Sequence, residues 1–154
     1  MLVDTNILLR RIHRSHPQYR QARDAITSLN RRGDVLRVTA QNLIECWAVC
    51  TRPTENNGLG LLPDQAGRVL SRIENSVVRL SDDANTVCPE WRTLVASYGV
   101  SGKQSHDARL VATMKVHGVS HVLTYNTQDF RRYDGIVTIH PDDLEPSEMP
   151  NPQS

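Results

Sequence analysis

The feature that most constrains the fold of this chain is the alternation of short, mostly apolar segments with longer segments of helical periodicity. Short continuous apolar segments are typical of strands that are buried on both faces. Such strands occur in parallel sheets that helices cover on both sides. The sequence therefore predicts an α/β fold with three layers, α/β/α, around a central parallel sheet. The expected strands are residues 1–4, 35–38, 77–80, 121–124 and 136–139.

Helix start and stop signals lie between these strands. Thr39 is expected to cap a helix that ends near Arg52, because Pro53 follows. Ser105 is expected to cap a later helix that Gly118 closes. The other helices are expected over residues 5–9, 15–33, 63–74 and 87–98, with a loop over residues 54–62.

The length of 154 residues fits one domain. We expect a single domain over residues 1–144 and a flexible C-terminal tail over residues 145–154, which is rich in proline and poor in apolar residues. A hydrophobic content of 38% excludes a disordered chain. An aromatic content of 5% argues against a platform for stacking bases, and a net charge of +1 argues against a basic nucleic-acid coat protein.

Three features predict a cytoplasmic protein without a membrane segment. The chain opens Met-Leu-Val-Asp, with no basic and apolar leader. No apolar run approaches the ~18 residues that cross a bilayer. The cysteines Cys46, Cys50 and Cys88 form no CxxC pair, and their odd number suits a reducing compartment.

Four acidic residues lie where the predicted fold gives them access to one edge of the sheet. Asp4 ends the first strand, and Asp129 follows the fourth. Glu45 interrupts an apolar stretch of a helix, and Asp107 lies in the first turn of another. Each acid also has a purely structural interpretation. Asp4 can cap a helix, Asp129 can form a turn, Glu45 can face solvent, and Asp107 can complement a helix dipole.

Together the four acids point to a metal site. Crowded carboxylates repel each other, raise each other's pKa and are costly to bury. A hard divalent cation such as Mg²⁺ or Mn²⁺ removes that cost. Such an ion can hold a phosphate oxygen and lower the pKa of a water molecule. The grouping therefore predicts hydrolysis of a phosphodiester bond.

Four segments occur in an order that carries a family resemblance. They are Asp4-Thr5-Asn6-Ile7-Leu8-Leu9, Asn42-Leu43-Ile44-Glu45, His106-Asp107-Ala108-Arg109-Leu110-Val111-Ala112 and Leu123-Thr124-Tyr125-Asn126-Thr127-Gln128-Asp129-Phe130. Over residues 1 to about 144, their order and spacing resemble those of PIN domains, as in VapC-type toxins. The resemblance implies a PIN fold and a ribonuclease that depends on Mg²⁺ or Mn²⁺. It also implies the toxin of a toxin–antitoxin pair, with RNA as substrate and a cognate antitoxin protein as partner.

The resemblance also implies roles for individual residues. Thr5 and Asn6 would support the site by orienting Asp4 and water. Asn126 stands where many members have Asp, so it offers a carbonyl oxygen but no charge. The residues that match the metal-binding and catalytic positions are Asp4, Glu45, Asp107 and Asp129, with Asn126 and Asp129 sharing the place of the fourth acid.

Contacts beyond the acids are also expected. Lys103 and Arg109 lie near the expected site and can contact RNA phosphates, with ordinary solvated charges as the alternative. The positions Leu59, Leu61 and Leu62, together with the resemblance, predict a homodimer. A basic stripe that faces RNA, or a solvated helix face, is expected from Arg10, Arg11, Arg14, Arg20 and Arg23.

Two other functions stay open at this point. A phosphatase of the haloacid-dehalogenase type also opens with an Asp at a strand end. That chemistry needs a second Asp two residues later, where this chain has Asn6. A PIN module that binds RNA or protein without catalysis would be marked by the loss of acids, and Asn126 is the one position that fits this pattern.

Overall fold

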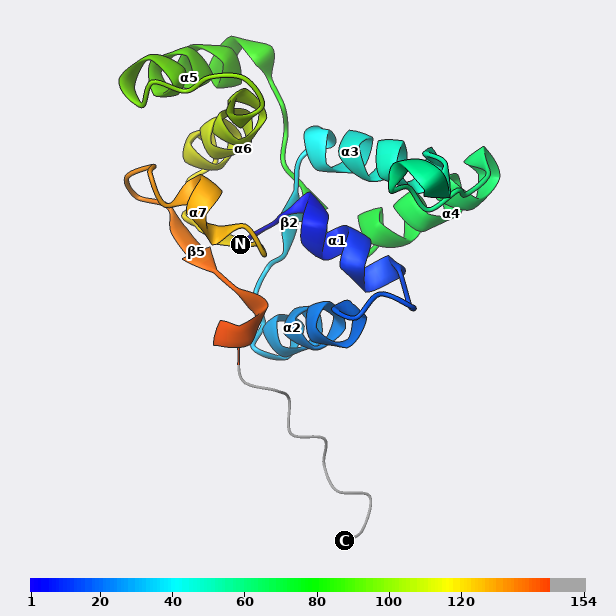
Figure 1. Cartoon of the computed structure of the whole chain (residues 1–154). Coiled ribbons are helices and arrows are strands. Elements are labelled where there is room, and N and C mark those ends of the chain that lie inside the picture. The colour runs from blue at the N-terminus through cyan, green and yellow to red at the C-terminus, as the bar shows by residue number, and fades with distance from the viewer. Residues whose placement is uncertain (145–154) are drawn as a thin grey trace, which may run out of the picture.

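Five parallel strands form one sheet in the order β3-β2-β1-β4-β5 (Figure 1). The structure is a computed structural model that describes residues 1–144, so the expected tail over residues 145–154 lies outside the described residues. The sheet confirms the predicted α/β class with a central parallel sheet. The strands are β1 (Leu2–Val3), β2 (Arg37–Val38), β3 (Val78–Arg79), β4 (His121–Leu123) and β5 (Val137–Ile139).

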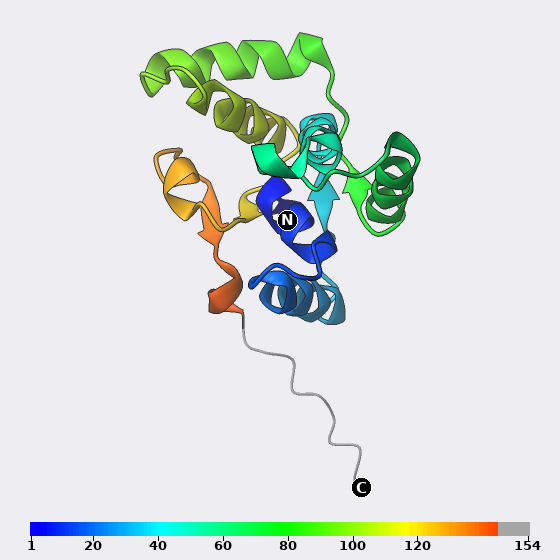
Figure 2. The same ribbon diagram turned by 45° about the vertical axis from the view of Figure 1, so that its right-hand side comes forward.

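Successive residues of the central strands face opposite layers, as the period of two in a strand requires. Leu2 of β1 and Val122 of β4 belong to one hydrophobic core, whereas Val3 and Leu123 belong to the other. The second of these cores is formed with α1 (Thr5–Ile12), α2 (Tyr19–Arg31), α3 (Ala40–Thr51) and α4 (Pro63–Glu74). The first is formed with α5 (Ala84–Ser97), α6 (Gln104–Val116) and α7 (Thr127–Phe130). Helices therefore cover both faces, and the two views show the three layers (Figures 1 and 2).

Three local predictions are wrong in detail. Ser105 does not cap α6 but lies inside it, and its Oγ donates to the carbonyl of Gly102 at 2.7 Å. Helix α5 begins at Ala84, earlier than expected, because the Asp83 side chain caps it by accepting from the Asn85 amide at 3.0 Å. The one-turn helix α7 was not expected, since four residues are too few to show a helical period. Two 3₁₀ turns, Thr54–Asn56 and Pro141–Asp143, were also missed.

Thr39 caps α3 as predicted, through a reciprocal pair of bonds with Asn42. The Thr39 hydroxyl accepts from the Asn42 amide at 3.3 Å, and Asn42 Oδ1 accepts from the Thr39 amide at 2.9 Å. Asn42 Nδ2 also donates to the hydroxyl of Thr5, the first residue of α1, at 3.1 Å. Both Thr39 and Asn42 are fully buried. This cap therefore fixes the start of α3 and holds it against the start of α1.

The cysteines are free thiols. Cys46 and Cys50 lie one turn apart on α3 and are buried in the core, while Cys88 is exposed. Burial raises the pKa of the Cys46 thiol, which keeps it protonated and suits a core residue rather than a metal ligand.

Among residues 1–144, no helix is both long and apolar enough to cross a lipid bilayer.

The cap of α3 generates a test of stability. Thr39→Ala should lower the free energy of unfolding by about 1 to 2 kcal/mol, because the buried backbone amide of Asn42 loses the hydroxyl that caps the helix. Thr93→Ala is the matched control, since Thr93 is an exposed helical threonine that donates only to the Pro89 carbonyl one turn earlier. Its cost should stay within about 0.5 kcal/mol. Urea denaturation measures both, and equal losses would contradict the role given to the cap.

Candidate active site

Polar residues gather at the carboxyl edge of the sheet, where the strand order reverses between β1 and β4. The chain passes from β1 outward through β2 and β3, and then returns to the other side of β1 for β4 and β5. In open parallel sheets, ligands bind at such a reversal point, beyond the carboxyl ends of the strands. Asp4 follows β1 directly, and residues 124–129 follow β4. Helices α3 and α6 bring Glu45 and Asp107 toward the same edge.

Asp4 is both the cap of α1 and the most enclosed acid of the group. Its Oδ1 accepts from the Thr5 amide at 2.7 Å, so the helix-cap interpretation is correct. Its Oδ2 accepts from Asn6 Nδ2 at 2.8 Å and from the Thr124 hydroxyl at 2.6 Å. The residue is only 9% exposed. Three donors therefore hold the carboxylate in one orientation.

Glu45 reaches the same network from α3 and is half-buried rather than part of a solvent-facing stripe. Its Oε2 accepts from the Thr5 hydroxyl at 2.6 Å. Its Oε1 accepts from Gln41 Nε2 at 2.9 Å. The backbone amide of Thr5 binds Asp4 while its side chain binds Glu45, so one residue links the two acids.

Asp107 and Asp129 complete the group through their charges. The pKa of Asp107 is raised to about 6 by burial and by the carboxylates of Asp129, Asp4 and Glu45, against a lowering effect of His106. The pKa of Asp4 is also raised to about 6, by burial and then by Glu45 and Asp129, while hydrogen bonds from Thr124 and Thr5 oppose the rise. Glu45 and Asp129 thus raise the pKa of both Asp4 and Asp107.

These acids are close without yet forming a closed chelate. In the part of the chain that the structure describes, no three carboxylate, imidazole or thiol groups are arranged to hold an ion as they stand. Hydrogen bonds hold Asp4 and Glu45, so the side chains of Asp107 and Asp129 are the ones that must rotate for several of these acids to bind one ion. Asp129 of α7 and Asn126, which directly precedes that helix, line a hollow together with Tyr125, Thr127 and Gln128.

The two supporting asparagines occupy different places. Asn6 Nδ2 donates to Asp4, and Asn6 Oδ1 accepts from the Tyr125 amide at 3.2 Å, so this side chain joins the two strand ends. Asn126 is exposed, and its side chain makes no cap to α7. Its backbone amide donates to the Thr124 hydroxyl at 3.0 Å. Asn126 is therefore held by its backbone and leaves its side chain free to turn.

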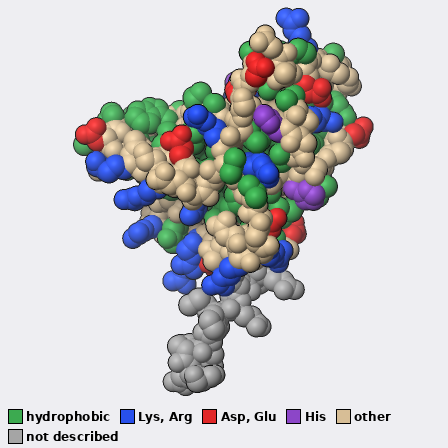
Figure 3. All heavy atoms as spheres, turned by 180° about the vertical axis from the view of Figure 1, so that it is seen from behind, with side chains coloured by type: hydrophobic (Ala, Val, Ile, Leu, Met, Phe, Trp, Pro, Cys, Tyr) green, Lys and Arg blue, Asp and Glu red, His purple; other side chains and the backbone are tan. Residues whose placement is uncertain are grey.

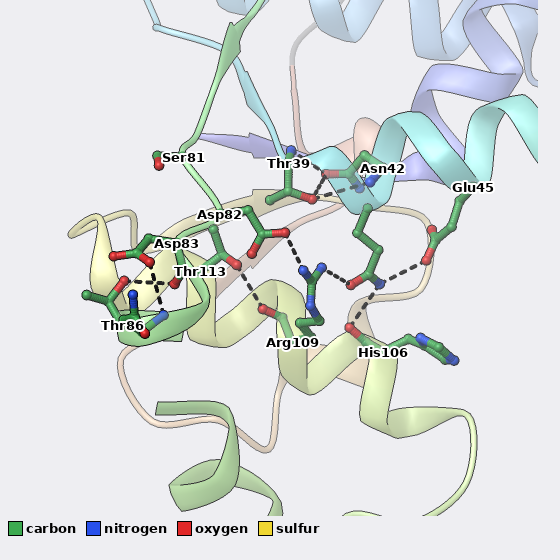
Figure 4. A network of polar contacts seen from close by, with 12 residues as sticks. Thr39, Asn42, Glu45, Ser81, Asp82, Asp83, Thr86, His106, Arg109 and Thr113 are labelled. Atoms are coloured by element: carbon green, nitrogen blue, oxygen red, sulfur yellow. Dashed lines mark hydrogen bonds and ion pairs between the residues drawn. The ribbon is translucent and has the colours of Figure 1, made fainter. Parts of the chain in front are cut away.

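The two cations near the site, Lys103 and Arg109, also differ in their surroundings. Lys103 is exposed at the start of α6, where its side chain is open to solvent. The Arg109 guanidinium is engaged within the protein: it forms an ion pair with Asp82 and donates to Gln41 Oε1 at 3.2 Å (Figure 4). Arg109 therefore orients Gln41, which in turn binds Glu45.

The arginines of α1 lie away from the acids. Arg11 and Arg14 line a hollow with Arg72 of α4, at the end of α1 opposite to Asp4. Of the other arginines in the expected stripe, Arg10 donates to Gln18 at 3.1 Å and Arg23 pairs with Asp24 at 2.7 Å, while Arg20 is exposed. Seen from behind, Lys and Arg side chains gather along one side and the lower part of the molecule (Figure 3).

Two residues of the site escaped the sequence analysis. Thr124 is fully buried and donates to Asp4, although it is 120 positions away. Its place at the end of the strand beside β1 is the signal that points to it. Gln41 binds Glu45, and its signal is the spacing of one helical turn between the two.

Comparison with protein-family models gives one match, to the PIN domain, over residues 1–136. A search of curated proteins finds no match. Solved structures do match. A chain of VapBC-1 from nontypeable Haemophilus influenzae has a TM-score of 0.65 at 15% identity, covering 92% of this chain and 97% of that one.

Two further solved structures show the same fold. A chain of VapBC2 from Rickettsia felis, bound to a DNA fragment from its promoter, has a TM-score of 0.62 at 15% identity and covers 90% of this chain and 96% of that one. VapC20 from Mycobacterium tuberculosis, a toxin that cleaves the sarcin-ricin loop, has a TM-score of 0.53 at 17% identity, with coverages of 79% and 85%.

The raised pKa of Asp4 generates a prediction for the metal-free protein. A carboxyl whose pKa is higher in the folded than in the unfolded state stabilises the fold while it is protonated, and that stability is lost as the pH rises through the folded pKa of about 6. In EDTA, this residue should therefore lower the free energy of unfolding by up to about 3 kcal/mol between pH 4 and 7. Urea denaturation across this range measures the slope.

Two variants isolate that contribution. Asp4→Asn removes the titrating group but keeps a side chain that caps helices well, so its stability should depend less steeply on pH than that of the unaltered chain. Asp24→Asn removes an exposed acid paired with Arg23 and should leave the slope unchanged. Identical slopes for Asp4→Asn and the unaltered chain would show that Asp4 does not carry this cost.

Proposed function

Because the chain belongs to the PIN domain family, we propose that it is a metal-dependent endoribonuclease that hydrolyses RNA phosphodiester bonds. The observation that carries this proposal is the position of four acids at the reversal point of the sheet, where Glu45 and Asp129 help to raise the pKa of Asp4 and Asp107. A fold alone does not assign an activity, so the argument rests on these side chains.

The donor set fits Mg²⁺ or Mn²⁺. Asp4, Glu45, Asp107 and Asp129 offer only carboxylate oxygens, which these hard cations prefer. Such an ion would supply charge to hold a phosphate and to lower the pKa of water.

The residues of this chain prepare the site for a phosphodiester. Thr5, Asn6 and Thr124 hold Asp4 and Glu45 in fixed orientations before any substrate arrives. Such prearrangement lowers the cost of ordering at the moment of reaction. Lys103, exposed at the start of the helix that carries Asp107, is placed to contact an RNA phosphate.

We further propose that the chain is the toxin of a toxin–antitoxin pair, with a cognate antitoxin protein as its partner. The solved structures that share its fold support this, because several come from VapBC complexes. A cytoplasmic site of action follows from this proposal, since RNA is the substrate.

A second candidate is a PIN module that binds RNA or protein without cleaving. Asn126, at a position where many members carry Asp, is the observation that favours it. It predicts binding without hydrolysis, so the same cleavage assay separates the two functions.

Neutralising single acids should abolish cleavage and spare the fold. Asp4→Asn and Asp107→Asn should each reduce RNA cleavage in Mn²⁺ by about a hundredfold or more, because a metal ligand loses its charge. Their Tm in EDTA should equal or exceed that of the unaltered chain, since repulsion falls. Gel assays on unstructured and hairpin RNA, with calorimetry for the Tm, measure the two effects.

The exposed ion pair between Arg23 and Asp24 supplies the control for this experiment. Asp24→Asn should cleave as the unaltered chain does, and EDTA should stop cleavage by both. Cleavage that continues in EDTA would contradict the proposed dependence on a metal ion. Undiminished cleavage by Asp4→Asn and Asp107→Asn would remove these acids from it, and RNA binding without any cleavage by the unaltered chain would favour the binding module.

We also propose that the protein is a homodimer. Leu59 and Leu61 pack partly against the core, so the exposed apolar candidates are Leu62 at 66% exposure, with Ile44 and Trp47 on α3. Light scattering at micromolar concentration should give twice the mass of one chain. Leu62→Asp should weaken the dimer more than Val35→Asp, a change at an exposed loop valine, and a monomeric unaltered chain would contradict the proposal.

A further inference from the structure

A buried glutamine joins the two helices that carry Glu45 and Asp107. Gln41 lies on α3 and is 8% exposed. Its Nε2 donates to Glu45 Oε1 at 2.9 Å and to the backbone carbonyl of His106 at 3.1 Å. Its Oε1 accepts from Arg109 Nη1 at 3.2 Å. Every polar atom of this side chain therefore has a partner, and two of the three partners lie on α6.

The first of these bonds fixes the direction of the Glu45 carboxylate. Gln41 and Glu45 are one helical turn apart, so their side chains lie on the same face of α3. Gln41 takes one carboxylate oxygen while Thr5 takes the other. With both oxygens held, Glu45 points to the edge where Asp4 lies instead of turning to solvent.

The second bond sets the separation between Glu45 and Asp107. The carbonyl that Gln41 binds belongs to His106, the residue just before Asp107. One amide group thus contacts the carboxylate of Glu45 and the backbone beside Asp107. Glu45, His106 and Arg109 converge on this point from two helices (Figure 4).

Arg109 decides which way the amide faces. A guanidinium has donors but no acceptor, so Gln41 must present its oxygen to Arg109 and its NH₂ to Glu45. Arg109 is itself oriented by its ion pair with Asp82, in the segment between β3 and α5. A reversed amide would set oxygen against the Glu45 carboxylate and NH₂ against the guanidinium, and both contacts would be repulsive.

We propose that Gln41 is a positioning residue, oriented by Arg109, that holds the Glu45 carboxylate in the acid site at a fixed separation from Asp107. This rests on the proposed function, because its consequence is a site preset for a divalent ion. In this role neither Gln41 nor Arg109 is a ligand of the ion. They act through Glu45 and through the backbone before Asp107.

The test compares four variants of the full chain by Mn²⁺ binding in the absence of RNA. Gln41→Met keeps the size of the side chain and removes all its polar contacts. Arg109→Met frees the amide, whereas Arg109→Lys keeps a cation beside Gln41 Oε1. Gln65→Met is the matched control, because Gln65 makes its amide contact with Leu62 at the start of α4. Electron paramagnetic resonance of free Mn²⁺ gives the affinity, and circular dichroism checks the fold.

Loss of a residue that orients a metal ligand weakens metal binding by roughly 10- to 100-fold. Gln41→Met should therefore raise the Kd for Mn²⁺ about tenfold or more, and Arg109→Met should raise it several-fold. Arg109→Lys should stay closer to the unaltered chain, and Gln65→Met should match it. A residue that only supports the fold would lower the Tm in EDTA without changing the Mn²⁺ affinity of the folded protein.

The outcomes separate this proposal from the proposed function. If the unaltered chain binds Mn²⁺ and folded Gln41→Met binds it equally well, the positioning role is overturned and the nuclease proposal stands. If the unaltered chain binds no Mn²⁺, both are overturned. Should Gln41→Met fail to fold, the pair Arg109→Met and Arg109→Lys decides, and equal affinities for these two would overturn the proposal.

Discussion

Repulsion among carboxylates at one edge of the sheet is the constraint on which the rest of the site depends. Burial raises the cost of ionising Asp4 and Asp107, and the nearby carboxylates of Glu45 and Asp129 add to that cost. Donors from Thr5, Asn6, Thr124 and Gln41 offset part of it. The repulsion that these hydrogen bonds do not offset can be reduced by a bound divalent cation. The fold thus holds its acids close at some expense of its own stability.

The contacts that build the fold are also those that build the site. Asp4 caps α1 with one oxygen and faces the site with the other. Asn42 closes the cap of α3 and binds Thr5, whose hydroxyl in turn holds Glu45. The cap of α3 is therefore linked to Glu45 by two hydrogen bonds, from Asn42 to Thr5 and from Thr5 to Glu45. These shared contacts allow a strand as short as β1 to position the candidate site.

Much of the fold could be predicted because its signals are local. The strands carry short apolar runs, Thr39 and Pro53 bound α3, and the carboxyl ends of the strands locate Asp4 and Asp129. What escaped prediction depends on distant partners. Thr124 binds Asp4 across 120 positions, and Arg109 binds Gln41 across 68, which no local pattern reveals. Ser105 does not cap α6, because that helix already begins at Gln104, after a turn at Gly102 where φ is positive.

The central claim is that this edge of the sheet is a site for a divalent cation that replaces protons on crowded acids. The most direct test is the Tm of the metal-free chain as Mn²⁺ is added, at pH 7 and at pH 5. An ion that binds only the folded state stabilises it by RT ln(1 + [Mn²⁺]/Kd), so the Tm continues to rise as the Mn²⁺ concentration exceeds the Kd. We predict that the Tm rises with the logarithm of the Mn²⁺ concentration at pH 7 and rises much less at pH 5, where Asp4 and Asp107 hold protons. A Tm that does not change with added Mn²⁺ at either pH would contradict the account.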